Sequence, residues 1–181
     1  MTLRTWRWTI ALAVASLAAG CYDLEMPDRV EADCLDPNAD VCWQRLSSGE
    51  TTSWLDAIDY CDKMGLGGFD WRLPSIGELR SLIAGCGTTE IGGACGVTDD
   101  CLDSTDCAGD ACIGCTAGIG PGSGDNYWVA ELEGPSGCYW SSSSWTNNSM
   151  NAWGVSFESG AVGGNAKGGY CFVRCVADAE E

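Results

Sequence analysis

Apolar residues recur at helical spacing in the stretch that follows Ser53. They lie three or four residues apart, at Trp54, Ala57, Ile58 and Cys61. Ser53 can cap a helix, and Asp56 lies three residues further on, in a capping-box-like position. Gly65, Gly67 and Gly68 then supply the left-handed backbone on which helices end. The pattern therefore predicts a helix that begins after Ser53 and ends at these glycines.

A second helical pattern follows in the stretch GFDWRLPSIGELRSLI, residues 68–83. Ser75 and Glu78 form the S-x-x-E capping box at its start. The apolar positions that follow are Ile76, Leu79, Leu82 and Ile83. These residues predict a helix with one buried face.

The residues between the two patterns predict a structural corner. Pro74 cannot lie inside a helix without removing a hydrogen bond, but it fits just before Ser75. Trp71 and Leu73 are expected to pack beneath the corner. The guanidinium of Arg72 is expected to bind exposed backbone carbonyls, because its donors form a planar fork.

Strand patterns lie on both sides of these helices. Residues 41–46 (VCWQRL) predict a first strand. Three more strand-like stretches follow from Tyr139 onward, namely YWSSSSW, AWGVSFESGAV and YCFVRCV. Two helices followed by short antiparallel strands predict an α+β fold for residues 41–178.

Residues 86–126 break the pattern, since they are rich in Gly, Asp, Thr and Cys and hold almost no large apolar side chains. Such a stretch cannot form a core of its own. It contains six cysteines, an even set that can pair internally: Cys86, Cys95, Cys101, Cys107, Cys112 and Cys115. The stretch therefore predicts a disulfide-rich surface insertion.

The first twenty residues have the pattern of a secretory signal. Two arginines precede an apolar run that is too short to span a bilayer. The run ends in Leu-Ala-Ala-Gly before Cys21, which resembles a bacterial lipobox and predicts lipidation of Cys21. An ordinary cleaved signal, with Cys21 left for a disulfide, is the alternative. Residues 21–40 carry seven acids and one arginine and are expected to form a solvated tether.

The cysteine count agrees with a lipid anchor. The chain has thirteen cysteines, so assigning Cys21 to the lipid leaves twelve that can all pair in an oxidising compartment. Cys171 and Cys175 lie about 13 Å apart in a predicted strand, too far to bond each other. Each needs a partner elsewhere, and Cys61 points to the same core. The predicted pairs are Cys61–Cys175, Cys138–Cys171 and Cys34–Cys42.

Charge narrows the classes of partner. The formal net charge is −17, and loss of residues 1–20 makes it about −19. Such a chain repels nucleic acid and sulfated glycans, while cations, neutral ligands and basic proteins remain possible partners. The chain has no histidine, the commonest general base and metal ligand, and no enzyme activity is expected.

Several of these segments together resemble the Lcl C-terminal domain family. They are CWQRL, TSWLDAIDYCDKMGLGGFDWRLPSIGELRSLI, YWSSSSW, AWGVSFESG and VRCV, between Val41 and Val176. The resemblance implies an exported bacterial protein with a C-type-lectin-like fold, two helices on a twisted antiparallel sheet. A collagen-like adhesin of this family binds sulfated polysaccharides. This chain has no Gly-X-Y stalk and a strongly acidic composition, so the fold transfers better than the ligand.

Two groups of residues are candidate ligand sites. Carboxylate oxygens suit calcium, and five aspartates lie close together in the insertion: Asp99, Asp100, Asp103, Asp106 and Asp110. They lack the EF-hand spacing, so a solvated acidic loop is the favoured interpretation. Tryptophans near loops can stack on a sugar, and three are placed in this way: Trp128, Trp145 and Trp153.

These observations predict a lipid-anchored envelope protein, expected at the outer membrane, with a non-catalytic lectin-like domain that binds a surface glycan or protein. The alternative is a structural envelope module in which the acidic insertion binds calcium or acts as a spacer.

Overall fold

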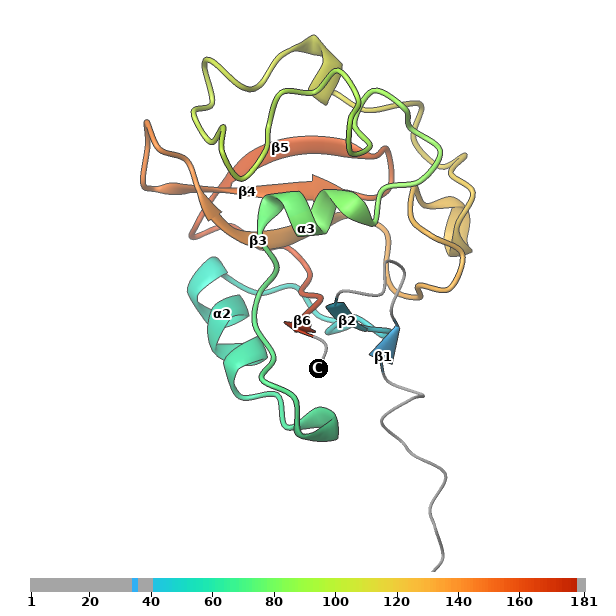
Figure 1. Ribbon diagram of the computed structural model, residues 1–181, viewed down its shortest axis with the longest axis vertical. Helices are drawn as coiled ribbons and strands as arrows, with labels where there is room; N and C mark the ends of the chain where they lie inside the picture. Colours follow the sequence, from blue (N-terminus) through green and yellow to red (C-terminus); the bar gives the residue numbers. More distant parts are fainter. Residues whose placement is uncertain (1–33, 36–40, 179–181) are drawn as a thin grey trace, which may run out of the picture.

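Figure 1 shows the computed structural model of the chain, which describes residues 34–35 and 41–178. The helices are α2 (Trp54–Asp62) and α3 (Ile76–Ser81), with short 3-10 turns at Leu66–Gly68, Asp110–Cys112 and Ser123–Asp125. The strands are β1 (Cys34–Leu35), β2 (Val41–Gln44), β3 (Cys138–Ser144), β4 (Asn151–Ser156), β5 (Ala161–Ala166) and β6 (Val176–Asp178). The fold is thus mixed α and β. No helix in these residues is long and apolar enough to cross a membrane.

The strands form two antiparallel sheets. One has the order β1-β2-β6 and the other the order β3-β4-β5. β2, which corresponds to the strand predicted over residues 41–46, ends at Gln44, two residues earlier than predicted. The two ends of the described chain meet in the first sheet, where Cys42 lies opposite Ala177.

The prediction of a single strand over YCFVRCV is wrong, because only the residues from Val176 onward form a ladder. The preceding residues bond to different partners in turn. Cys171 bridges to Thr52, and Phe172 exchanges hydrogen bonds with Cys138 and Trp140. The extended segment 171–178 therefore passes from the β3 edge of one sheet to the edge of the other, where β6 pairs with β2, and joins the two.

Both helices begin as the sequence predicts. Ser53 caps α2 by accepting a hydrogen bond from the backbone nitrogen of Asp56. Ser75 and Glu78 form a complete capping box at the start of α3. α2 ends at Asp62, and Gly67 and Gly68 adopt positive φ in the turn that follows, as expected. The same expectation for Gly65 is wrong, since its φ is −97°.

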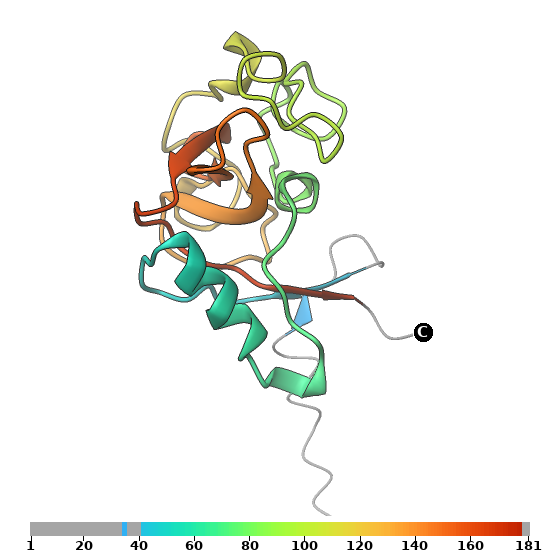
Figure 2. The ribbon, with the colours of Figure 1, turned by 90° about the vertical axis from the view of Figure 1, so that its left-hand side faces the viewer.

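The two helices cover different parts of the fold. α3 lies across β3 and β4 (Figure 1), while α2 lies beside the C-terminal segment (Figure 2). The larger core cluster contains Ile76 and Leu79 of α3 with Trp128, Tyr139 and Phe157. The second cluster lies under α2 and includes Ala57, Trp71, Leu73, Trp140 and Val173. Trp71 and Leu73 thus pack beneath the corner, as expected.

Disulfides join distant parts of the chain. The predicted pairs Cys61–Cys175 and Cys138–Cys171 are both present. The six cysteines of the insertion pair among themselves, as Cys86–Cys115, Cys95–Cys112 and Cys101–Cys107. Cys42 is also disulfide-bonded, but the side chain of Cys34 lies outside the described residues, so the Cys34–Cys42 pair stays a prediction.

The insertion, residues 86–126, lies at the end of the domain opposite β1, β2 and β6 (Figure 1). Its composition predicts a surface element, and the structure shows that part of it also enters the main core. Val97 is fully buried, and Cys95 and Cys112 are almost so. These small side chains reach the core because they pack against residues of α3 and the β3-β4-β5 sheet.

Candidate functional site

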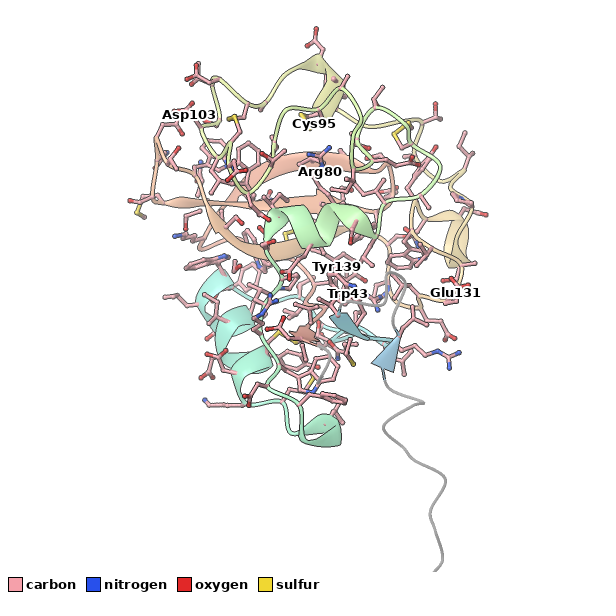
Figure 3. The ribbon with its side chains drawn as sticks, viewed as in Figure 1. Trp43, Arg80, Cys95, Asp103, Glu131 and Tyr139 are labelled. Carbon is pink, nitrogen blue, oxygen red and sulfur yellow. A yellow bond between two sulfur atoms is a disulfide. The ribbon has the colours of Figure 1, made fainter. Side chains whose placement is uncertain are left out.

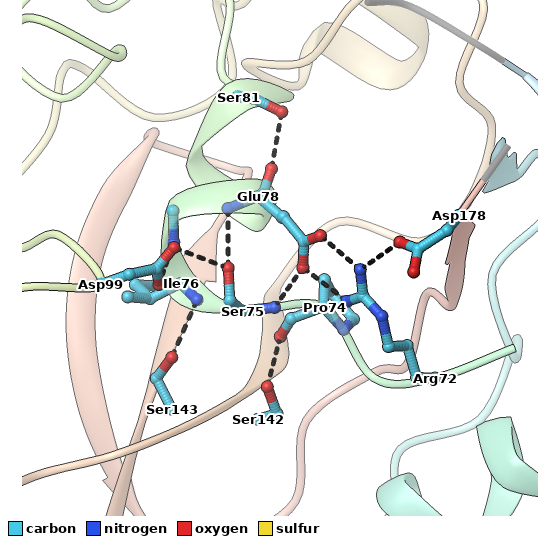
Figure 4. A network of polar contacts seen from close by, with 11 residues as sticks. Arg72, Pro74, Ser75, Ile76, Glu78, Ser81, Asp99, Ser142, Ser143 and Asp178 are labelled. Atoms are coloured by element: carbon cyan, nitrogen blue, oxygen red, sulfur yellow. Dashed lines mark hydrogen bonds and ion pairs between the residues drawn. The ribbon is translucent and has the colours of Figure 1, made fainter. Parts of the chain in front are cut away.

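The corner before α3 is held by ion pairs, as Figure 4 shows. Both terminal nitrogens of Arg72 donate to the Glu78 carboxylate at 2.7 Å, and one also reaches Asp178 at 2.8 Å. The expectation that Arg72 binds backbone carbonyls is therefore wrong: the capping carboxylate of α3 lies within reach, and a bidentate pair with it is the stronger contact. The corner joins α3 to the end of β6.

The pKa values of this corner follow from its contacts. The Glu78 hydrogen bond raises the pKa of Arg72, although burial opposes this. Burial alone would raise the pKa of Glu78, but hydrogen bonds from Arg72 and Ser75 together outweigh it and hold that pKa below its usual value. The pair is thus charged at neutral pH and links helix cap to sheet.

The serine run of β3 belongs to the same network. Ser142 donates to the carbonyl of Pro74, and Ser143 accepts a hydrogen bond from the backbone nitrogen of Ile76. Ser141 donates to the Trp153 carbonyl. These hydroxyls therefore tie the corner and the start of α3 to the sheet.

The three tryptophans predicted to stack on a sugar are not exposed together. Trp128 and Trp153 are 0% and 1% exposed and belong to the main core. Trp145 is half-buried, with its ring packed over Gly164 and its centroid 5.4 Å from that of Trp153. The interpretation of Trp128 and Trp153 as sugar-stacking residues is wrong, since the insertion and the sheet cover them. Stacking by Trp145 stays a prediction.

The five aspartates of the insertion are not gathered into a metal-binding group. Among residues 34–35 and 41–178, no set of three or more His, Cys, Asp or Glu side chains could hold a metal ion. Asp99 instead caps α3, accepting from the Ser75 hydroxyl at 2.9 Å and from the Gly77 nitrogen at 3.0 Å. Asp103 accepts from the backbone nitrogens of Thr105 and Asp106 within its own turn.

Arg80 is a structural residue that the sequence did not reveal. Its side chain is 1% exposed and points from α3 towards the insertion (Figure 3). The guanidinium donates to the carbonyls of Thr89, Glu90 and Val97. Burial lowers its pKa, but an arginine remains charged at neutral pH. Arg80 thereby fixes the path of the insertion.

Arg174 has a similar role in the C-terminal segment. It is completely buried and donates to the carbonyls of Gln44, Arg45 and Glu133. Its guanidinium lies 5.4 Å from the centre of the Trp128 ring. Because no carboxylate accepts from it in these contacts, Arg174 acts as a polar clamp between loops.

An open groove runs along the solvent side of α2 and the turn that follows it. Its volume is ≈ 590 Å³, and its apolar surface comes mainly from Tyr60, Met64 and Leu66. Tyr60 and Leu66 are 39% and 38% exposed. The Tyr60 hydroxyl accepts a hydrogen bond from Gln44, and the Leu66 carbonyl accepts one from Trp71. Contacts to the core thus hold the floor in place while its apolar surface remains open.

The rim of this groove, here called the α2 groove, is charged. Asp56 and Asp59 lie one helical turn apart on the exposed face of α2. Lys63, one turn further on, places its ammonium 2.5 Å from the Asp59 carboxylate. Gly65 also lines the groove, and a Cβ added there would meet nothing within 4 Å. The groove therefore combines an apolar floor with carboxylates and was not suggested by the tryptophan pattern.

Comparison with known proteins identifies the family. No curated protein matches the chain. The family model for the Lcl C-terminal domain matches residues 33–177, which include both sheets, both helices and the insertion. The chain therefore belongs to the Lcl C-terminal domain family.

Proposed function

We propose that the chain is an exported, lipid-anchored cell-envelope protein whose domain binds a surface glycan or protein without catalysing a reaction. In this proposal Cys21 carries the lipid, the protein resides in the outer membrane, and the domain has a C-type-lectin-like fold. Two helices beside antiparallel strands support such a fold.

Disulfides support export. Five complete pairs lie within the described residues, and they include bonds between elements as distant as α2 and the C-terminal segment. Disulfides persist in oxidising compartments and are rare where thiols are kept reduced. A domain stapled in this way presents a rigid surface outside the cytoplasm.

The α2 groove is the observation that carries the binding role. An exposed aromatic ring on an ordered helix beside apolar side chains offers contact area at low entropic cost. Since Tyr60 and Leu66 are already anchored to the core, little order has to be gained on binding.

Occlusion of the groove tests the binding role. Gly65 has φ −97°, which other residues adopt, so Gly65→Trp is expected to fill the groove and leave the fold intact. Gly109→Trp is a matched control in the insertion, where a Cβ also meets nothing. The mature protein is applied to immobilised neutral glycans and to envelope proteins of its host. Loss of binding with Gly65→Trp alone supports the groove, and equal binding by both variants contradicts it.

A separate experiment tests the anchor. Cys21→Ser removes the proposed lipid attachment site, so the protein is expected to move from the membrane fraction to the soluble fraction. Retention of the variant in the membrane would contradict lipidation at this residue.

A spacer role for the insertion is the second candidate. Three internal disulfides cross-link the insertion, and the Arg80 guanidinium and the Asp99 cap attach it to α3. Such attachment favours a rigid element that holds assembly partners apart. The spacer role is tested by cross-linking the protein to its neighbours in the envelope. Arg80→Met removes the contacts that fix the insertion and should change which proteins are captured.

A further inference from the structure

The chemistry of the α2 groove differs from that of the surrounding surface. An apolar floor of Tyr60, Met64 and Leu66 lies directly beside the carboxylates of Asp56 and Asp59. A ligand that fits both features carries apolar groups and positive charge close together. A neutral ligand could offer the carboxylates only neutral hydrogen-bond donors, which bind them more weakly than charged donors do, and an anionic ligand would be repelled by them.

Lys63 shows that this rim accepts an ammonium group. It lines the groove, and its side chain is 73% exposed while paired with Asp59. An exposed pair four residues apart on a helix contributes little stability. A second cation can therefore take the place of Lys63 on Asp59 at small cost.

Negative charge disfavours two possible ligands of the α2 groove, a segment of the same chain and a second copy of it. Residues 21–40 of the same chain carry seven acids and one arginine. A second copy of the chain has a formal net charge of −17. Both would bring further negative charge towards the carboxylates of the groove.

We infer that the α2 groove binds a cationic, amphipathic segment of another protein. An apolar side chain of that segment lies on Tyr60, Met64 and Leu66, and its neighbouring lysine or arginine pairs with Asp59 in place of Lys63. The inference rests on the binding role proposed above and names the class of partner.

The test uses the mature full-length protein and a defined probe, an acetylated and amidated hexapeptide of alternating lysine and leucine. A glutamate-leucine peptide of the same length is the control probe. Binding is measured by titration calorimetry at low and at physiological salt. The lysine peptide is expected to bind, with an affinity that falls as the salt concentration rises. The glutamate peptide is expected not to bind.

Charge variants separate the groove from the acidic surface as a whole. Asp59→Asn is expected to weaken binding of the lysine peptide about two- to five-fold, and Lys63→Met to strengthen it by a similar factor. Asp100→Asn removes the same charge from an exposed position in the insertion and should leave binding unchanged. Equal weakening by Asp59→Asn and Asp100→Asn would overturn the inference, because the peptide would then recognise the net charge alone.

Steric variants complete the test. Gly65→Trp should abolish binding of the lysine peptide, and Gly109→Trp should not. If the peptide fails to bind but Gly65→Trp blocks a neutral glycan, the groove is a binding site and the inference about its ligand is wrong. If Gly65→Trp blocks nothing, the proposed function of the groove is wrong as well.

Discussion

The contact between Gly77 and Asp99 allows a sharp test of what fixes the insertion to the domain. The Asp99 carboxylate accepts one hydrogen bond from the Gly77 nitrogen and one from the Ser75 hydroxyl. A Cβ at position 77 would lie 2.3 Å from an Asp99 oxygen. Gly77→Ala must therefore displace the carboxylate and break both contacts.

The magnitude follows from two opposing effects. Loss of a helix-cap interaction lowers the free energy of unfolding by about 0.5–2 kcal/mol. Replacement of a helical glycine by alanine raises it by about 0.5–1 kcal/mol. Gly77→Ala is thus expected to destabilise the protein by about 0.5 kcal/mol. In an Asp99→Ala background the carboxylate is already absent, so the same substitution should stabilise it by about 0.5 kcal/mol.

The assay is a double-mutant cycle on the free energy of unfolding, measured by urea denaturation with tryptophan fluorescence. A change of sign between the two backgrounds is the expected result. Limited proteolysis within residues 86–126 should increase with either single variant, because both remove one of the contacts that hold the insertion on α3. Equal destabilisation by Gly77→Ala with and without Asp99 would refute the reasoning.

Three further predictions follow from the ion pair, the disulfides and the acidic loop. Because the pKa of Glu78 is held below its usual 4.5, its ionised form stabilises the protein above that pH, and this stabilisation is lost as the pH falls further. The difference in free energy of unfolding between wild type and Glu78→Gln should therefore shrink in acid. A constant difference across a pH series would contradict the prediction. Replacing Cys61 and Cys175 by alanine opens a loop of 114 residues and should lower the free energy of unfolding by about 5 kcal/mol. The same change at Cys101 and Cys107, which are six residues apart, should lower it by about 2 kcal/mol. Equal melting temperatures for the two double variants would refute this ranking. Calcium should leave the melting temperature of the protein unchanged, and a rise that chelator reverses would establish a site.

Local signals in the sequence predicted local structure well. Ser53, Ser75 and Glu78 act through atoms three residues away, so their capping roles can be read directly from the chain. The Cys61–Cys175 pair could also be inferred, because helical spacing places Cys61 on the buried face of α2 and Cys175 needs a partner other than Cys171.

Long-range features could not be predicted in the same way. Trp128 follows a glycine-rich loop, yet it is buried because the rest of the domain closes over it. Arg80 looks like an exposed helix residue in the sequence, since the carbonyls that it binds come from the irregular insertion. The α2 groove depends on how the turn after α2 returns towards the helix, and no periodic pattern encodes that path.

The C-terminal segment that joins the two sheets also sets the order of folding. β2 pairs with β6, and the longest-range disulfide described here joins positions 114 residues apart. Contacts between distant parts of a chain form late and slowly. The two sheets cannot be joined until residues 171–178 are available, so β2 lacks its β6 partner and Trp140 lacks its Phe172 partner before then.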